Sequence, residues 1–439
     1  MTREAMHRID DQVLGSLGRP SRGYLAVLAI CAVLVVAGAV AFGIQYALGM
    51  GVTGLSIPVG WAVYITNYVW WIGVAMSGTF ISAMLFLFKV NWRSNISRVA
   101  ETMTIFAIAS AGLFPLIHLG RVWVFYWILP YPNTAGLWPN FKSPLVWDVF
   151  AIVVYLVLSL LIFYLGLLPD LATARDRTQP SWRRTMYAYL ALGWTGKYDQ
   201  WRHWTRGYLL IAAMAMPLAM SVHSIVSWDF AMGLLPGWHE TIFAPYFVAG
   251  AVLSGFALII LLLVPLRKAL HLENIFTVYH FEQLAKLMIL MALILGYCYG
   301  VMSFMSWYSG DRFSRQFEFH RDFHSRYSPL FWAMILANFL LPLTFFSKRL
   351  RTNLAYVYVI ALVVEVGLWI ERFVIIVPSL AYGFLPSSWG VYAPRLPEIA
   401  LTGLSFGLFL GLFLVFVALF PSVAMYELKE QAIARTEGS

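Results

Sequence analysis

Three residues that could handle protons lie around the gap between two apolar segments of the chain. His118 and Arg121 are three residues apart, so on a helix they would share one face. Asp148 stands near the start of the next apolar segment, in the sequence Ser-Pro-Leu-Val-Trp-Asp. A neutral imidazole can accept a proton from a hydroxyl group, and a nearby carboxylate orients the imidazole and raises its basicity. These residues could therefore take protons from a substrate, or they could only tie two helices together.

Further ionisable residues interrupt apolar stretches, where a charge is costly and usually marks function or a buried partner. They are Glu101, His223, Asp229, His280, Glu282, Glu365 and Arg372. A series of such groups could conduct protons, and we predict that role for them. Glu101 and Glu282 also have a simpler explanation, because a carboxylate at the start of a helix is stabilised by the helix dipole. Glu365 needs a partner, for which Arg372, two turns later, is one candidate.

The residue types for a resident metal centre are missing from the sequence. Its two cysteines, Cys31 and Cys298, stand alone in apolar runs, whereas an iron–sulfur cluster needs about four thiolates. The sequence has no CxxCH haem-attachment motif, and no apolar segment carries two histidines at a spacing suited to haem. We therefore expect no metal ion, haem or iron–sulfur cluster in this chain.

Composition places the chain in a lipid bilayer. Hydrophobic residues make up 61% of the 439 residues and charged residues 12%, whereas a soluble domain carries roughly 25% charged residues. The mean hydropathy is +0.74. Since a membrane-spanning helix needs about 20 apolar residues, we predict an all-α polytopic membrane protein with about ten transmembrane helices. Their expected ranges are 24–49, 59–88, 101–128, 144–168, 207–235, 240–265, 280–308, 328–346, 354–378 and 401–426.

Alternate loops differ in positive charge. With the N-terminus inside, the inner segments hold 21 of the 30 Lys and Arg residues, the outer segments hold 6, and the rest fall within spans. This bias predicts that both termini are cytoplasmic. We expect residues 1–23 to form a cytoplasmic N-terminal segment, 24–426 the membrane domain and 427–439 a cytoplasmic tail. The bias also explains the net charge of +9, so nucleic acid is not an expected partner.

A weak internal repeat predicts how the helices are grouped. Gly73-Val-Ala-Met-Ser-Gly78 in the second span matches Gly250-Ala-Val-Leu-Ser-Gly255 in the sixth, and each span is followed by a basic loop and a carboxylate. Small residues at this spacing let helices approach closely, and they are common in membrane helices without any duplication. A true duplication four spans apart predicts two parallel four-helix bundles, about 59–235 and 240–378, flanked by the first and last helices.

This topology brings His118 and Asp148 to the outer half of the membrane. The helix over 101–128 runs outward and the next one returns, so His118 would lie about ten residues below the outer end of its helix, roughly 15 Å deep. A quinol, which is soluble in lipid, loses two protons as its two electrons leave, and such a pair could accept them. A purely structural cluster explains the same residues equally well.

The chain resembles a known family over nearly its whole length. The motifs that carry the likeness are Met76-Ser-Gly-Thr-Phe, Ala111-Gly-Leu-Phe-Pro-Leu-Ile-His-Leu-Gly-Arg121, Tyr131-Pro-Asn, Ser143-Pro-Leu-Val-Trp-Asp148, Gly237-Trp-His-Glu-Thr and Glu371-Arg-Phe-Val-Ile-Ile-Val-Pro. They are similar to the NrfD/PsrC superfamily of quinone-reactive membrane subunits, and within it to the ActC-type subunits of alternative complex III.

The resemblance implies a quinol pocket in which His118 and Asp148 act on the substrate, with menaquinol as the expected quinol. Arg121, Trp147, Ser77 and Gly78 are expected to complete the pocket. It also implies that electrons pass to a periplasmic iron–sulfur subunit and that protons could be translocated. Further implied partners are c-type haem subunits, a second NrfD-like subunit and membrane lipids, in a bacterial cytoplasmic membrane. The chain would not be catalytic alone.

The same sequence features also fit other functions. The chain could be the membrane quinone subunit of a polysulfide reductase or a hydrogenase, because the sequence does not fix the direction of electron flow. A secondary transporter would also use buried carboxylates, although it would favour inverted repeats and a site at the membrane midplane. A passive membrane anchor would have no quinone chemistry at all.

Overall fold

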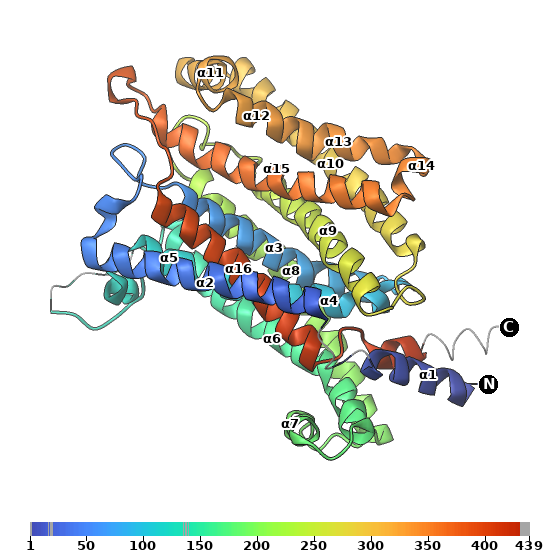
Figure 1. Cartoon of the computed structure of the whole chain (residues 1–439). Helices are drawn as coiled ribbons and strands as arrows, with labels where there is room; N and C mark the ends of the chain where they lie inside the picture. Colours follow the sequence, from blue (N-terminus) through green and yellow to red (C-terminus); the bar gives the residue numbers. More distant parts are fainter. Residues whose placement is uncertain are drawn as a thin grey trace.

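The computed structural model describes residues 2–15, 17, 21–134, 136, 138 and 140–430 of the chain. All regular elements in these residues are helical (Figure 1). The long elements are α2 (Arg22–Leu48), α3 (Val63–Leu87), α4 (Arg93–Ala111), α6 (Pro144–Arg177), α8 (Tyr198–Ala231), α9 (Phe243–Ala269), α10 (Val278–Tyr308), α15 (Leu354–Ala381) and α16 (Leu396–Leu419). Residues 431–439 of the expected tail, and 1, 16 and 18–20 of the expected N-terminal segment, lie outside the described residues.

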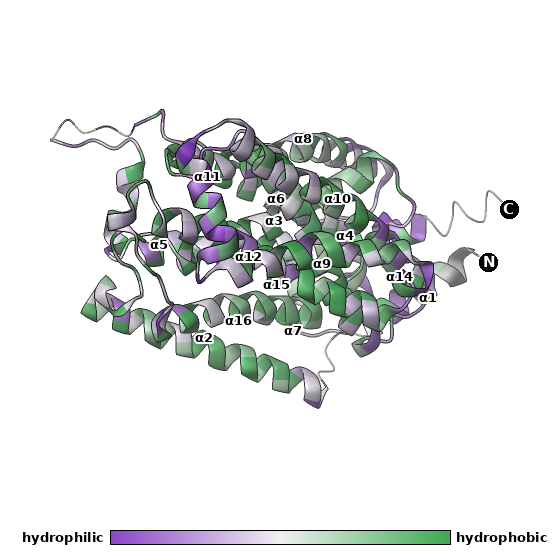
Figure 2. Ribbon diagram, turned by 90° about the horizontal axis from the view of Figure 1, so that it is seen from above, coloured by the Kyte–Doolittle hydropathy of each residue, from purple (hydrophilic) through white to green (hydrophobic). Residues whose placement is uncertain are grey.

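The predicted all-α polytopic membrane fold is confirmed. Nine helical segments of the described chain are long and apolar enough to cross a membrane. Their apolar residues form nearly continuous bands along the helices (Figure 2), as expected where lipid forces every backbone polar group to bond within its own helix. These nine include the segment Ser328–Phe346 and not α15, a helix of 28 residues that carries Glu365, Glu371 and Arg372. This protein is therefore a multi-pass membrane protein.

The helices group around a central pair, α3 and α9. The helix α3 packs against α4 and α8, and α9 packs against α10 and α15, while α3 and α9 also contact each other. The first group is completed by α6, which packs on α8, and the second by the broken helix from α12 (Ser328–Ile335) through η4 (Leu336–Leu340) and α13 (Leu341–Leu343). The outer pair, α2 and α16, packs together and contacts α4 through α16.

Small residues hold the central helices close together. A Cβ on Gly255 of α9 would come 2.3 Å from the Ser77 hydroxyl of α3, and a Cβ on Gly78 would come 2.3 Å from the backbone oxygen of Ala100 on α4. The last glycine of each copy of the repeated motif, Gly78 or Gly255, therefore lies at a helix–helix contact, where only glycine leaves enough room.

The bundle has two distinct ends. The short helix α1 (Thr2–Gly15) lies at one end, where Asp10 forms ion pairs with Lys429 and with Arg177. We call this the termini end. The opposite, distal end carries the short helices α5 (Leu113–His118) and α11 (Arg312–Phe319) (Figure 1). The helices α3, α6 and α9 begin at the distal end, whereas α8, α10 and α15 finish there.

The largest difference between the expected and observed spans concerns the helix expected over residues 101–128. The helix begins earlier, at Arg93, and is interrupted at Gly112 before the short helix α5 ends at His118. Pro115 has no N–H to bond the Ala111 backbone oxygen, which accounts for the interruption, and Gly120, with a left-handed φ of 67°, ends the helix. Residues Val122–Ile128 form a separate 3-10 helix, η2.

Candidate functional site

A tyrosine and two aspartates from three helices meet near the distal end of the first helix group. The Tyr68 hydroxyl, on the second turn of α3, donates a hydrogen bond of 2.5 Å to Oδ2 of Asp148. Asp148 lies on the second turn of α6, a helix whose start is fixed by Pro144 at its first position. Asp229, on the last turn of α8, lies close enough to interact electrostatically with both Asp148 and Tyr68.

Each of the two carboxyl groups has one buried oxygen without a protein donor. Oδ1 of Asp148 and Oδ1 of Asp229 are both buried and accept no hydrogen bond from the residues that the structure describes. A buried acceptor without a donor is costly, so such atoms usually mark the place of a ligand or water. The cluster formed by Tyr68, Asp148 and Asp229 therefore offers two free acceptors to a molecule that brings hydroxyl donors.

His118 lies at the end of its helix rather than about ten residues before that end. It is the last residue of α5, so the expected position about ten residues below the helix end is wrong, because the helix stops at Gly120. Its Nδ1 is buried without a hydrogen-bond partner in the described part of the chain. The helix α5 is fixed by Gln45 of α2, which donates to the Ile117 backbone oxygen at 2.9 Å and accepts from the Tyr64 hydroxyl at 2.7 Å.

The other expected pocket residues have contacts of their own in the structure. Trp147 is half exposed and donates its indole hydrogen to the Phe141 backbone oxygen, and Arg121 is exposed in the turn after α5. The Ser77 hydroxyl donates to the Val74 backbone oxygen of its own helix, and Gly78 packs against α4. Their expected contact with a quinol stays a prediction.

Comparison with known proteins identifies the family of this membrane protein. A family model described as "Polysulphide reductase, NrfD" matches residues 51–382. The chain belongs to the NrfD family. The superfamily predicted from the sequence motifs is thereby confirmed.

Two curated relatives are similar to part of this NrfD-family chain. One is a putative membrane subunit of dimethyl sulfoxide reductase from Halobacterium salinarum, 29% identical over 249 residues, which cover 56% of this chain and 52% of that protein. The other is a selenate reductase subunit from Mesobacillus selenatarsenatis, 24% identical over 245 residues, which cover 54% of this chain and 55% of that protein. The chain spans about half the length of the curated relatives it matches.

Towards the termini end, Glu101 forms the centre of a buried polar cluster. It accepts hydrogen bonds from the Ser82 hydroxyl at 2.9 Å and the Tyr208 hydroxyl at 3.0 Å, and it pairs with Arg98 at 3.4 Å. Arg98 also bonds Asp170 at 2.9 Å. Because α4 begins at Arg93, Glu101 lies in its third turn, and the helix dipole does not explain its position.

Two expected members of a proton path have structural surroundings at the termini end. Glu282 forms ion pairs with Lys286 at 3.1 Å and with Arg351 at 3.0 Å near the surface. The His280 side chain accepts a hydrogen bond from the Thr277 backbone and caps the start of α10. The Glu282–Arg351 pair ties α10 to the short helix α14 (Lys348–Arg351) before α15.

The buried charges of α15 have partners other than those expected. Glu365 accepts a hydrogen bond of 2.9 Å from the Ser254 hydroxyl of α9. Arg372 pairs instead with its neighbour Glu371 at 3.3 Å and lies over the ring of Phe247, so the suggested Glu365–Arg372 pair is wrong. The rise of the helix explains this, since residues seven apart lie about two turns, or roughly 10 Å, apart along the axis.

His223 lies between the two helix groups. It is fully buried on α8, its ring packs on Phe247 of α9, and a Cβ on Gly73 of α3 would contact it at 3.3 Å. Within the described residues, no group of three or more His, Cys, Asp or Glu side chains could hold a metal ion.

Outside the membrane spans, two acidic residues near α11 are affected by burial. Burial raises the pKa of Glu318 to about 7 and that of Glu240 to about 6, while Arg321 opposes both shifts. Arg321 pairs with Glu318 at 3.8 Å and with Asp322 at 2.7 Å. This group of charges covers the distal side of the second helix group.

Proposed function

We propose that this chain is the quinol-oxidising membrane subunit of a respiratory oxidoreductase complex. The observation that carries the proposal is the pair of unpartnered carboxyl oxygens on Asp148 and Asp229, beside the Tyr68 hydroxyl. A quinol carries two hydroxyl groups on one ring and needs acceptors for both protons.

In the proposed reaction the quinol gives up two electrons and two protons and leaves as a quinone. Asp148 and Asp229 accept the hydrogen bonds of the quinol hydroxyls and then the protons. Tyr68 holds the Asp148 carboxyl in place through the other oxygen. His118, nearer the distal end with a free Nδ1, is the next acceptor on the way out. The chain holds the substrate, and the electrons leave to a partner subunit.

The proposed orientation places the distal end at the outer face of a bacterial cytoplasmic membrane and both termini in the cytoplasm. It rests on the distribution of Lys and Arg in the sequence. An iron–sulfur subunit would then bind at the distal end, within electron-transfer reach of the Tyr68–Asp148–Asp229 cluster. The Glu101 cluster and Glu365 lie along the interior towards the opposite face, and we propose them as a route for proton translocation.

Two kinds of complex fit this subunit. The names of the two relatives favour a reductase complex, in which quinol electrons reduce a terminal acceptor such as a sulfoxide or an oxyanion. The sequence motifs favour alternative complex III, with c-type haem subunits and a second NrfD-like subunit as partners. In both, menaquinol is oxidised at the membrane subunit, so the proposed site chemistry is the same.

The test is quinol oxidation by the purified complex carrying Asp148→Asn, with assembly checked on a native gel. We expect a loss of about 100-fold or more in turnover, the scale of a lost general base. The matched control is Asp176→Asn, at an exposed carboxylate on the same helix. Full turnover in an assembled Asp148→Asn complex would exclude this site and favour a passive anchor. Uptake of a solute by the chain alone would favour a transporter.

A further inference from the structure

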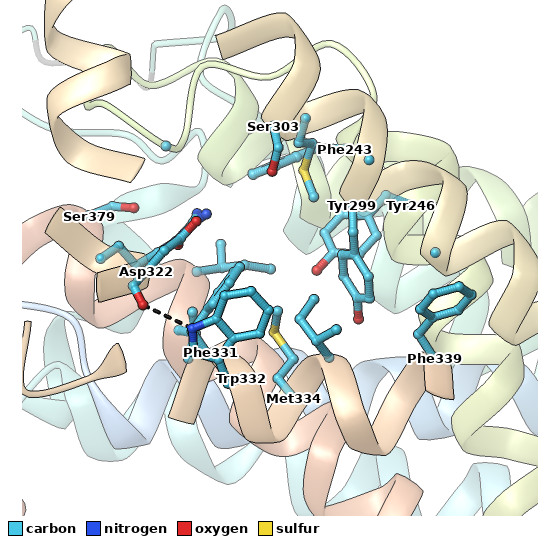
Figure 3. Close-up of a pocket in the computed structure, with 18 of the residues that line it drawn as sticks. Phe243, Tyr246, Tyr299, Ser303, Asp322, Phe331, Trp332, Met334, Phe339 and Ser379 are labelled. Atoms are coloured by element: carbon cyan, nitrogen blue, oxygen red, sulfur yellow. Dashed lines mark hydrogen bonds and ion pairs between the residues drawn. The ribbon is translucent and has the colours of Figure 1, made fainter. Parts of the chain in front are cut away.

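A cavity lies in the second helix group, away from the Tyr68–Asp148–Asp229 cluster of the first group. It has a volume of about 280 Å³ and is lined by residues of α9, α10, α12 and α15 near the distal end. Figure 3 shows Tyr299, Phe331 and Met334 around one space, with Ser379 on its far side. Its size approaches that of small-molecule sites, which start near roughly 300 Å³.

The cavity opens sideways between two helices. The helix α10 packs against η4 and α13, whereas its contact with α12 is marginal at most, so the two helices diverge towards the distal end. Gly300 of α10 lines the cavity, and a Cβ built on it would meet no described atom within 4 Å. A ligand dissolved in the bilayer could therefore enter between α10 and α12 without passing through water.

The walls are aromatic and carry one buried hydroxyl that has no partner among the described residues. The rings of Phe243 and Tyr246 from α9, and of Phe331, Trp332 and Phe339 from the broken helix, line the cavity. The Ser379 hydroxyl, on a side chain that is 1% exposed, has no hydrogen-bond partner in that part of the chain. A buried hydroxyl that lines a cavity without a partner can bond a polar group of a ligand.

The charges around the cavity are already paired. Arg321 at the mouth is neutralised by Asp322, and the Trp332 indole donates to the Asp322 backbone oxygen. At the bottom, Glu371 pairs with Arg372 and accepts hydrogen bonds from Tyr299 and from Asn338. An anionic lipid headgroup would find no free cation among the described lining residues, so the cavity favours a neutral ligand.

We propose that this cavity binds a second lipid-soluble ring of the quinone class, with Ser379 bonding a ring oxygen. The aromatic walls suit a flat ring, the opening to the bilayer suits an isoprenoid tail, and the neutral charge balance suits a quinone or quinol. The site is separate from the proton-accepting cluster of the first helix group. The choice of ligand class rests on the proposed function, whereas the existence of a binding cavity does not.

The test uses a photoreactive azido-quinone on the purified complex, with labelled peptides located by mass spectrometry. We expect labels in two regions, one near Asp148 and one in α10 or α12. Gly300→Leu should fill the opening and lower the second label about tenfold, because its side chain occupies the ligand's space. Met305→Phe, on the opposite side of α10, is the matched control and should lower neither label. Ser379→Ala should weaken binding about fivefold, the effect of one lost hydrogen bond.

The outcomes separate this proposal from the proposed function. A label only near Asp148, unaffected by Gly300→Leu, overturns the second site and leaves the proposed function standing. A label only in α10 or α12 supports the second site and counts against the quinol site at Asp148. A phospholipid that stays bound in the wild type through detergent washing and is lost in Gly300→Leu, with no azido-quinone label in α10 or α12, overturns the assignment to a ring.

Discussion

The Tyr68 hydroxyl of α3 donates a hydrogen bond to the Asp148 carboxyl of α6, and this contact joins two helices at the proposed quinol site. It satisfies one oxygen of the carboxyl group and leaves the other free of any donor among the described residues. Tyr68 therefore positions the proton acceptor without competing for the substrate.

Replacing Tyr68 by Phe should reduce quinol oxidation without preventing assembly. The lost bond has a charged acceptor and is worth about 1.5–3 kcal/mol, so kcat/KM should fall roughly 10- to 100-fold. Tyr187→Phe removes a comparable hydroxyl, which bonds the Leu419 backbone oxygen at 2.6 Å, and is the matched control. Steady-state assays with a soluble quinol analogue measure both. Equal losses in the two variants would show that Tyr68 is only structural.

Asp229 and Asp148 should act together. If both accept protons from one quinol, Asp229→Asn should reduce turnover about 100-fold, and the double variant should lose little more than either single one. Turnover of the wild type, the two single variants and the double variant gives the coupling free energy between Asp148 and Asp229. Independent, additive losses would place Asp229 outside the site.

The sequence predicted the fold well because its signals were local. Apolar runs and basic loops predict the number and order of the helices. Glu101, Asp148, His223 and Glu365 could be predicted as buried polar residues, because ionisable side chains rarely occur in such runs. Tyr68 was missed, since a tyrosine in a membrane helix is common and only its partner on another helix marks it. The depth of His118 was also missed, because the helix end at Gly120 depends on the left-handed backbone there.

Gly78→Ala should destabilise the protein through crowding. Its Cβ would lie 2.3 Å from the Ala100 backbone oxygen, so α3 and α4 would have to separate. Overpacking of this kind costs about 1–3 kcal/mol. The control is Gly43→Ala on α2, where a Cβ meets no described atom within 4 Å. Thermal unfolding in detergent should show a lower Tm for Gly78→Ala alone, and an unchanged Tm would contradict the tight contact.

The pH dependence of stability should weaken in Glu318→Gln. Burial raises the pKa of Glu318 from 4.5 to about 7, so the folded state keeps a proton that the unfolded state releases. The contribution of Glu318 to the free energy of unfolding is therefore complete below about pH 4.5 and is lost as the pH rises to about 7. The wild-type Tm should therefore drop further between pH 5 and pH 7.5 than that of Glu318→Gln, by about 2–4 °C. The exposed control, Glu273→Gln, should follow the wild type, and parallel curves for Glu318→Gln would contradict the shift.

The Glu371–Arg372 pair should show strong coupling in stability. Glu371 is fully buried, so Arg372→Met would leave a buried carboxylate without its counter-charge, a change that costs about 3–5 kcal/mol. The guanidinium also lies 4.1 Å from the centre of the Phe247 ring, a contact that methionine only partly replaces. Adding Glu371→Gln removes the unpaired charge, and the double variant should recover most of the lost Tm. If the double variant unfolds at a still lower temperature than Arg372→Met, the two residues stabilise the bundle independently, and the pair does not account for Arg372.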